Sequence, residues 1–338
     1  MTTPLISIIV PTWNDGATIE RCVRSLEAQT WSRLEILVID DASDDDTGAR
    51  LDELAQECMR LRVFRQSQRA GAASARNIGF QEARGEILAL IDGDMWAPPE
   101  WLELLAAPLL EGEQDVTGGP DLVPEDSPLV SRCVGYSMDS ILTNAGLRLG
   151  DSKLVKYLPG TGNMAITREA LLRAGEFDEE FHDTGEDKEW LHRVRETGGR
   201  MLYLPHALAW HERKPDLMLH ARKQLLSGRR RFDIVKKDPG SFEWPHFAPS
   251  ALILFLVLGG LLPHLRALWL AVWVLGTALV CWDCLRGSMK IGDLRAFPIL
   301  VFSSSCIPFG YGLGVLWRAG ETAVSALTGR TEANADGE

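Results

Sequence analysis

The chain has 338 residues, more than one hydrophobic core usually serves, so two folded units are expected. Its formal net charge is −12, which argues against a nucleic-acid-binding protein, because such proteins present a basic face. The charge is uneven: between residues 211 and 237, nine basic residues stand against three acidic ones.

The first hundred residues alternate between short apolar runs and helical patterns of apolar residues. We expect strands at residues 5–10, 34–39, 61–65 and 87–91. One helix is expected to start near Ile19, and two more are expected at 47–58 and 72–83. Each apolar run has the length of a buried strand and stops at turn-forming residues. Strands that alternate with helices indicate βαβ units, so the sequence predicts an α/β fold with a mainly parallel sheet flanked by helices.

Polar residues follow three of these strands, at the point where each strand ends. They are Thr12 and Asp15 after the first, Asp40 and Asp41 after the second, and Asp92 and Asp94 after the fourth. The carboxyl ends of parallel strands meet at one edge of the sheet, where open α/β sheets bind ligands. Paired carboxylates at this edge can bind Mg²⁺ or Mn²⁺, which usually also binds substrate phosphates. Taken alone, Asp92-Gly-Asp94 also fits a solvated turn. The convergence of three strand ends favours a nucleotide pocket with a metal.

Two common nucleotide-binding motifs are absent from the sequence. No G-x-G-x-x-G follows the first strand, and no Walker A sequence occurs anywhere in the chain. A standard dinucleotide-binding fold and a P-loop enzyme are therefore both disfavoured.

Three apolar runs follow the basic stretch, at residues 247–262, 267–282 and 297–317. A membrane helix takes about 17–25 residues, so the first two runs are at the short end and also fit buried helices or a re-entrant hairpin. Tryptophans cluster in this region, as they do at membrane interfaces, and loops rich in Lys and Arg stay in the cytosol. We therefore expect a multi-pass protein of the cell membrane with residues 1–240 on the cytosolic side.

Seven short motifs resemble those of family 2 glycosyltransferases, which have the GT-A fold. They are Ser7-Ile-Ile-Val-Pro-Thr-Trp-Asn14, Glu35-Ile-Leu-Val-Ile-Asp-Asp-Ala-Ser43, Ala75-Arg-Asn-Ile-Gly79, Asp92-Gly-Asp94, Gly162-Asn-Met-Ala-Ile166, Gly185-Glu-Asp187 and Ala209-Trp-His211. They occur in the family's order and span residues 5–215. The resemblance implies an inverting, hexosyltransferase-type enzyme that uses a nucleotide-sugar, most often a UDP-sugar, and a divalent metal, Mn²⁺ or Mg²⁺.

The resemblance also implies roles for individual residues on the donor side. The uridine would be held by Pro11, Thr12, Asp15, Asp40 and Asp41. Arg76 would lie near the base or the diphosphate. Asp94 would ligate the metal, Asp92 would contact the ribose or a metal-bound water, and His211 would reach the metal or the β-phosphate.

On the acceptor side, Asp187 matches the family's general base. An acceptor hydroxyl loses its proton as it attacks, so a positioned carboxylate on the opposite face assists the reaction. The structural alternative is that Asp187 begins a helix over residues 187–197 and stabilises its N-terminus. Glu186 and Asn163 are expected on the acceptor side, with Glu186 as an acceptor contact or a supporting group rather than the base.

The domain organisation follows from these observations. We expect a GT-A catalytic domain at 1–215, a basic juxtamembrane segment at 216–246, a membrane domain of two to three apolar helices at 247–320 and an acidic tail at 321–338. Apolar residues between Gly118 and Pro159, together with the membrane anchor, favour a lipid-linked or glycan acceptor. No Q-x-x-R-W occurs, which favours transfer of one sugar over polymerisation.

Two other functions fit parts of the sequence. A nucleotidyltransferase shares the nucleotide-binding sheet and the carboxylate–metal chemistry, but its first strand is normally followed by a basic, glycine-rich loop. Here that loop is Trp13-Asn14-Asp15-Gly16, which is acidic. A non-catalytic membrane scaffold with a degenerate sheet domain would have no reason to retain Asp92, Asp94 and Asp187 together.

Overall fold

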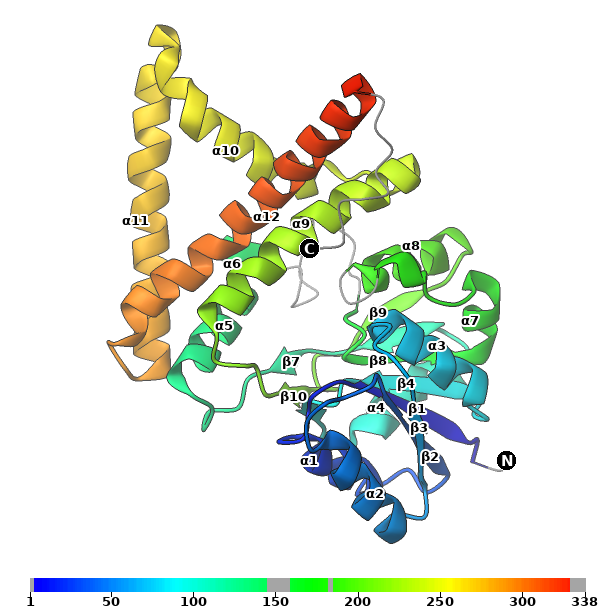
Figure 1. The fold of residues 1–338 in the computed structure, drawn as a ribbon. Coiled ribbons are helices and arrows are strands. Elements are labelled where there is room, and N and C mark those ends of the chain that lie inside the picture. The colour runs from blue at the N-terminus through cyan, green and yellow to red at the C-terminus, as the bar shows by residue number, and fades with distance from the viewer. Residues whose placement is uncertain (1–2, 145–158, 182–184, 329–338) are drawn as a thin grey trace. The chain divides into compact units, whose positions relative to one another are not determined.

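The computed structural model describes residues 3–144, 159–181 and 185–328 (Figure 1). The chain divides into two compact units. The first consists of Met1–Gly135 and Gly146–Pro215, and the second of Tyr136–Ala145 and Asp216–Glu338. Residues 136–145, which the sequence placed with the catalytic domain, thus belong to the second unit.

The first unit is built on a seven-stranded sheet with the strand order β3-β2-β1-β4-β8-β6-β9. Its strands are β1 (Ile6–Thr12), β2 (Leu34–Asp40), β3 (Leu61–Arg65), β4 (Ile87–Ile91), β6 (Val116–Gly118), β8 (Asn163–Thr167) and β9 (Met201–Tyr203). The four predicted strands are confirmed as β1 to β4, which pair in parallel. β8 runs antiparallel to both β4 and β6, so the complete sheet is mixed.

A smaller sheet joins segments that lie far apart in the sequence. It contains β5 (Met95–Trp96), β10 (Ala209–His211) and β7 (Asp121–Leu122), in that order. β10 pairs antiparallel with β5 and parallel with β7. Because β5 directly follows Asp94 and β10 ends at His211, this sheet brings two predicted site residues together.

Helices cover both faces of the large sheet. They are α1 (Ile19–Glu27), α2 (Thr47–Glu57), α3 (Ala72–Glu82), α4 (Trp101–Leu110), α7 (Arg168–Ala174) and α8 (Glu186–Glu196). One core packs α1, α2 and α4 against residues such as Ile8 and Val10, and the other packs α3, α7 and α8 against Ile9. Strand β1 is therefore buried on both faces, which explains its uninterrupted apolar sequence.

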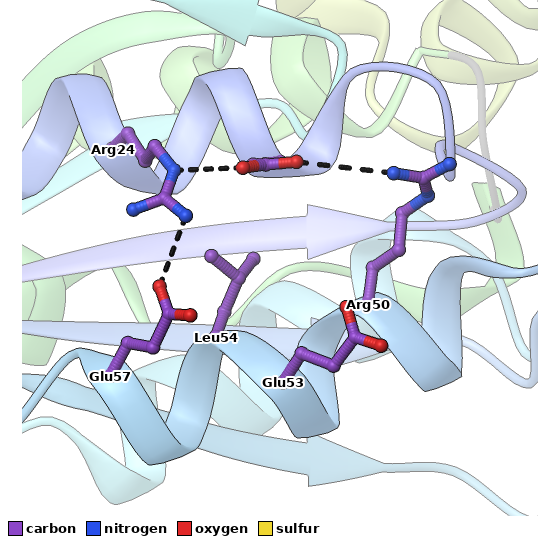
Figure 2. A pocket seen from close by; sticks show the side chains of 6 residues that line it. Arg24, Arg50, Glu53, Leu54 and Glu57 are labelled. Carbon is purple, nitrogen blue, oxygen red and sulfur yellow. Dashed lines mark hydrogen bonds and ion pairs between the residues drawn. The ribbon is translucent and has the colours of Figure 1, made fainter.

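A pocket between α1 and α2 is lined mainly by charged residues (Figure 2). Arg24 pairs with Glu20 at 2.8 Å and with Glu57 at 3.0 Å, while Arg50 lies 3.9 Å from Glu20. These side chains are about half exposed, and such pairs contribute little to stability. The pocket lies on the helices rather than at the strand ends, so it is not the predicted nucleotide site.

The second unit is helical and carries a large exposed apolar surface. Its main helices are α9 (Leu217–Lys237), α10 (Ala248–Leu258), α11 (Arg266–Ile291) and α12 (Ala296–Thr328), and α6 (Ile141–Asn144) also belongs to it. Among the described residues, three stretches are long and apolar enough to cross a membrane: Trp244–Leu261, Pro263–Ile291 and Ala296–Thr328. The second apolar run, predicted over residues 267–282, is part of the longer helix α11, which has 26 residues.

The helix α5 (Leu129–Asp139) has its last residues in the second unit, where they meet a buried carboxylate. The hydroxyl of Tyr136 donates to Asp283 Oδ1 at 3.1 Å, and the hydroxyl of Ser140 donates to Asp283 Oδ2 at 2.8 Å. Ser137 Oγ lies 2.6 Å from Ser303 Oγ of α12. These buried hydrogen bonds fix the end of α5 to α11 and α12.

Candidate active site

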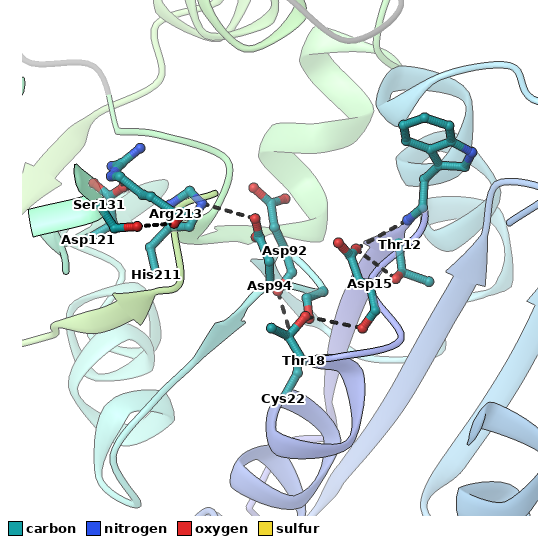
Figure 3. A network of polar contacts seen from close by, with 12 residues as sticks. Thr12, Asp15, Thr18, Cys22, Asp92, Asp94, Asp121, Ser131, His211 and Arg213 are labelled. Atoms are coloured by element: carbon teal, nitrogen blue, oxygen red, sulfur yellow. Dashed lines mark hydrogen bonds and ion pairs between the residues drawn. The ribbon is translucent and has the colours of Figure 1, made fainter. Parts of the chain in front are cut away.

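The Asp92-Gly-Asp94 turn lies directly against the end of β1 (Figure 3). A Cβ atom on Gly93 would lie 2.6 Å from Thr12 Oγ1 and 2.8 Å from Asp15 Oδ2, too close for any other residue. The backbone N–H of Gly93 donates to the carbonyl of Pro11 at 3.2 Å. The glycine therefore allows the two strand ends to converge, as the sequence predicted.

Asp15 lies in a buried position beside another carboxylate. Its Oδ2 accepts hydrogen bonds from Thr12 Oγ1 at 2.8 Å and from the Trp13 backbone N–H at 3.2 Å. Burial, and then the negative charge of Asp94, raise the pKa of Asp15 to about 6. Neighbouring carboxylates of this kind favour the binding of a cation between them.

A chain of polar contacts extends from Asp94 across the small sheet. Asp94 Oδ2 lies 3.2 Å from His211 Nε2, and Asp121 Oδ2 lies 3.2 Å from His211 Nδ1. Arg213 then donates to Asp121 Oδ2 at 2.6 Å. Burial alone would lower the pKa of His211, but Asp94 and Asp121 outweigh it and raise that pKa to about 9.

These residues fit a divalent metal. Asp94 Oδ2 and His211 Nε2 lie 3.2 Å apart, so a metal held by both would replace the proton between them. Asp121 orients the ring from its other nitrogen, as carboxylates do in histidine metal sites. Within the described ranges, no three His, Cys, Asp or Glu side chains form a complete metal site. A bound Mn²⁺ or Mg²⁺ would therefore take its remaining ligands from phosphate oxygens and water.

The end of β2 supplies two buried aspartates that organise loops. Asp40 Oδ1 accepts a hydrogen bond from the Ser43 backbone N–H at 3.0 Å. Asp41 accepts from the backbone N–H groups of Ala70 at 2.7 Å and Gly71 at 2.8 Å. Both lie at the same sheet edge as Thr12, and their contacts with a uridine stay a prediction.

Arg76 is 3% exposed and lies between two carboxylates. Its Nη2 donates to Asp92 Oδ1 at 2.9 Å, and its Nη1 donates to Glu186 Oε1 at 2.8 Å. Both terminal nitrogens of the guanidinium are thus occupied by protein groups. The expected place of Arg76 near the base or the diphosphate stays a prediction.

The two acids at the start of α8 differ in environment. Burial raises the pKa of Glu186 to about 7, although Arg76 opposes the shift. Asp187 is also affected by burial, but Lys188 outweighs it and holds the pKa of Asp187 below 3.8. The Asp187 side chain is 21% exposed and that of Glu186 is 7% exposed. Asp187 is the more accessible, ionised carboxylate of the pair.

Asn163 has a structural task. Its Oδ1 accepts from the Trp101 indole at 2.7 Å, and its Nδ2 donates to the carbonyls of Pro120 at 2.9 Å and Ala207 at 2.8 Å. The side chain is buried and supports the loops around β7 and β10. Its predicted place on the acceptor side therefore has no support from these contacts.

Sequence reasoning missed Asp121 and Arg213 at this site. Asp121 lies in a two-residue strand, which is too short to give a periodic pattern, and it contacts His211 only because β7 pairs with β10. Arg213 is one of many basic residues in the stretch after His211, so its pairing with Asp121 left no separate signal.

Comparisons with known proteins point to one family. The model of the family described as Glycosyl transferase family 2 matches residues 7–173. Glycosyltransferase AglE of Haloferax volcanii is 24% identical over 240 residues, which cover 70% of this chain and 76% of that protein. A GalNAc(5)-diNAcBac-PP-undecaprenol beta-1,3-glucosyltransferase of Campylobacter jejuni is 28% identical over 181 residues, which cover 53% of this chain and 56% of that protein.

The fold is also found among solved structures. The mannosyltransferase PcManGT from Pyrobaculum calidifontis, solved in complex with GDP-Man and Mn²⁺, aligns with a TM-score of 0.56 at 20% identity. The alignment covers 98% of this chain and 89% of that one. At this identity the likeness establishes the GT-A fold and leaves the activity to be inferred from the site.

Proposed function

Because the sheet domain of this chain belongs to glycosyl transferase family 2, we propose that it transfers one sugar from a nucleotide-sugar to a lipid-linked or glycan acceptor. The observation that carries the proposal is the convergence of Thr12, Asp15, Asp94 and His211 at one edge of the sheet. That edge is where open α/β sheets bind nucleotides. A UDP-sugar is the favoured donor.

Different residues at the strand ends bind different parts of the donor. Thr12, Asp15, Asp40 and Asp41 bind the nucleoside with Pro11, and Asp92 lies at the ribose. Asp94 and His211 would hold Mn²⁺ or Mg²⁺. When bound, such a metal neutralises the charge that develops on the phosphate oxygens of the leaving group.

Asp187 acts as the general base. The acceptor oxygen attacks the anomeric carbon on the face opposite to the diphosphate, and the bond between that carbon and the phosphate oxygen breaks. Asp187 takes the hydroxyl proton, the nucleoside diphosphate leaves with the electron pair, and the configuration of the sugar inverts. A low pKa keeps Asp187 ionised at neutral pH and ready to accept the proton.

The acceptor class is inferred from the anchor and from a relative. The Campylobacter relative is named as a glucosyltransferase of an undecaprenol-PP-linked glycan, and three helices of this chain are apolar enough to enter a membrane. We place the catalytic domain in the first compact unit, a basic juxtamembrane segment at 216–246 and the membrane helices within 247–328, since α12 continues into the expected tail at 321–338. The catalytic domain faces the cytosol, because the basic stretch stays on that side.

Calorimetric titration of UDP and GDP into the detergent-purified full chain tests the donor site. With Mn²⁺ present, we expect UDP to bind, and we expect EDTA and the Asp94→Ala variant each to abolish binding. The control is Asp52→Ala, which removes an exposed aspartate of α2 that pairs with Arg65. Binding of GDP instead of UDP would change the donor and keep the transferase. Binding of neither nucleotide would refute the donor site.

A further inference from the structure

The helix α3, which carries the Ala75-Arg-Asn-Ile-Gly79 motif, lies unusually close to the sheet. A Cβ atom on Gly79 would lie 2.3 Å from Ile9 Cγ2 of β1, so only glycine permits this approach. Around it, Ala73, Ala75 and Phe80 are buried in the same core. The helix α3 is therefore packed tightly against the sheet, and its side chains extend towards the ends of the strands.

Arg76 of α3 contacts two segments of the site. One is the turn after β4, through Asp92, and the other is the first residue of α8, through Glu186. All three side chains belong to the first unit. A guanidinium with its two terminal nitrogens on two carboxylates fixes their separation, because its geometry is planar and rigid.

The side chain of Asn77, the next residue, binds the backbone of Phe177, which precedes α8 in the chain. Its Nδ2 donates to the Phe177 carbonyl at 3.0 Å, and its Oδ1 accepts from the Phe177 N–H at 2.8 Å. The Phe177 ring lies 5.5 Å from Phe80 of α3 and 4.9 Å from Trp190 of α8, between ring centroids. The segment before α8 and α8 itself are thus both fastened to α3.

From these contacts we infer that Arg76 is a positioning residue for the transfer reaction: it holds the start of α8, with Asp187, beside the Asp92 turn. Arg76 acts through Glu186 and Asp92 rather than by binding the nucleotide. Glu186 is the anchor of this clamp, which leaves the neighbouring Asp187 as the base. The inference rests on the proposed function for the role given to Asp187.

The test compares four forms of the detergent-purified full chain: wild type, Arg76→Met, Glu186→Gln and the double variant. The matched control is Arg62→Met, because Arg62 also bridges two carboxylates, Glu35 and Glu82, each at 3.0 Å. Two properties are measured: hydrogen exchange of the α8 amides, and the affinity for UDP with Mn²⁺. Turnover of UDP-glucose, UDP-N-acetylglucosamine and GDP-mannose is followed as release of the nucleoside diphosphate.

We expect Arg76→Met to raise the exchange rate of the α8 amides at least tenfold, because it removes the hydrogen bond that holds Glu186 and leaves this buried side chain without its partner. The double variant should exchange no faster than Arg76→Met, since both changes break the same contact between Arg76 and Glu186. Nucleotide affinity should change less than threefold in Arg76→Met, while kcat for any sugar nucleotide that is turned over falls at least tenfold. Arg62→Met should change none of these.

Unchanged exchange of α8 in Arg76→Met would overturn the inference, whether or not the protein turns over a sugar nucleotide. A loss of nucleotide affinity with unchanged kcat would also overturn it, because that pattern belongs to a donor-binding residue. If wild type neither binds nor turns over a nucleotide, the proposed function fails, but the exchange measurement still decides whether the clamp exists.

Discussion

At the scale of single residues, the site depends on side chains that position other side chains. Asp94 and His211 face each other, and Asp121 holds the far nitrogen of the imidazole while it is itself held by Arg213. Supporting carboxylates of this kind fix the orientation and the tautomer of a metal-binding histidine.

We expect Asp121→Ala to weaken Mn²⁺ binding by about 10–100-fold, because His211 loses its orienting partner. Titration of Mn²⁺ by calorimetry in the presence of UDP measures the change. The matched control is Asp115→Ala, which removes another carboxylate bound by an arginine, Arg173 at 2.7 Å, away from the site. An equal loss of Mn²⁺ affinity in both variants would contradict the role given to Asp121.

Asp187→Asn should lower kcat by about 10²–10⁴-fold and leave the affinity for the donor nucleotide unchanged, because an amide cannot take the acceptor proton. Initial rates over a range of donor concentrations separate the two effects. Glu189→Gln serves as the control, since Glu189 lies on the same helix and pairs with Arg193 at 2.6 Å. Retention of wild-type kcat in Asp187→Asn would exclude it as the base.

At the scale of elements, the first strands are tied together by a buried carboxylate far from the site. Glu35 of β2 accepts from Ser7 Oγ of β1 at 2.7 Å, from the Arg84 backbone N–H at 2.7 Å, and from Arg62 at 3.0 Å. Burial opposes ionisation, but these three donors outweigh it and hold the pKa of Glu35 below 4.5.

This lowered pKa gives a direction for the pH dependence of stability. The unfolded chain takes up the Glu35 proton near pH 4.5, whereas the folded chain takes it up only at a lower pH. The stabilisation is therefore present above that value and is lost as the pH falls through the folded pKa. We expect Glu35→Gln to cost about 2 kcal/mol at pH 7 and to reduce the loss of stability below pH 4.5. Thermal unfolding at several pH values measures both, and an undiminished acid loss would contradict the assignment.

The elements that the sequence predicted well are those with long, regular patterns. The four predicted strands β1 to β4 are confirmed. The apolar runs of β1, β2 and β4 are continuous because these parallel strands are buried on both faces, whereas β3 lies at the edge of the sheet and is only partly buried. The five motifs between Ser7 and Ile166 lie within the residues that the family model matches, 7–173. What could not be predicted is the small sheet, because β5 and β7 have two residues each and form only through pairing with β10.

In the candidate site, too, some contacts could be predicted from the sequence and others could not. The convergence of Thr12, Asp15 and Asp94 follows from strand order, since parallel strands bring their carboxyl ends to one edge. The pairing of Arg76 with Glu186 does not, because it joins residues 110 positions apart through a helix and a loop that carry no periodic signal. Contacts of this kind depend on tertiary packing rather than on local sequence.

At the scale of the whole molecule, the exposed apolar helices set where the protein resides. Val257, Leu261 and Val274 are each at least 65% exposed, and a surface of such residues is unfavourable in water. We expect the chain to stay in the membrane pellet after an alkaline carbonate wash and to leave it only with detergent. Release by carbonate alone would contradict membrane insertion.

The proposed orientation is tested by protease protection. Protease added to inverted membrane vesicles should digest the sheet domain, whereas intact cells should protect it, with a soluble cytosolic protein as the control. Digestion from the outside of intact cells would reverse the orientation, because the basic stretch would then have crossed the membrane.

The membership of residues 136–145 in the second unit has a consequence for biosynthesis. A chain is made from its N-terminus, so this segment leaves the ribosome before α11 and α12 exist. Until those helices are complete, Tyr136, Ser137 and Ser140 lack Asp283 and Ser303, the partners that hold them in the finished protein. The end of α5 therefore acquires its native contacts only after nearly the whole chain has been translated, and the packing of the last helices becomes the step that completes the fold.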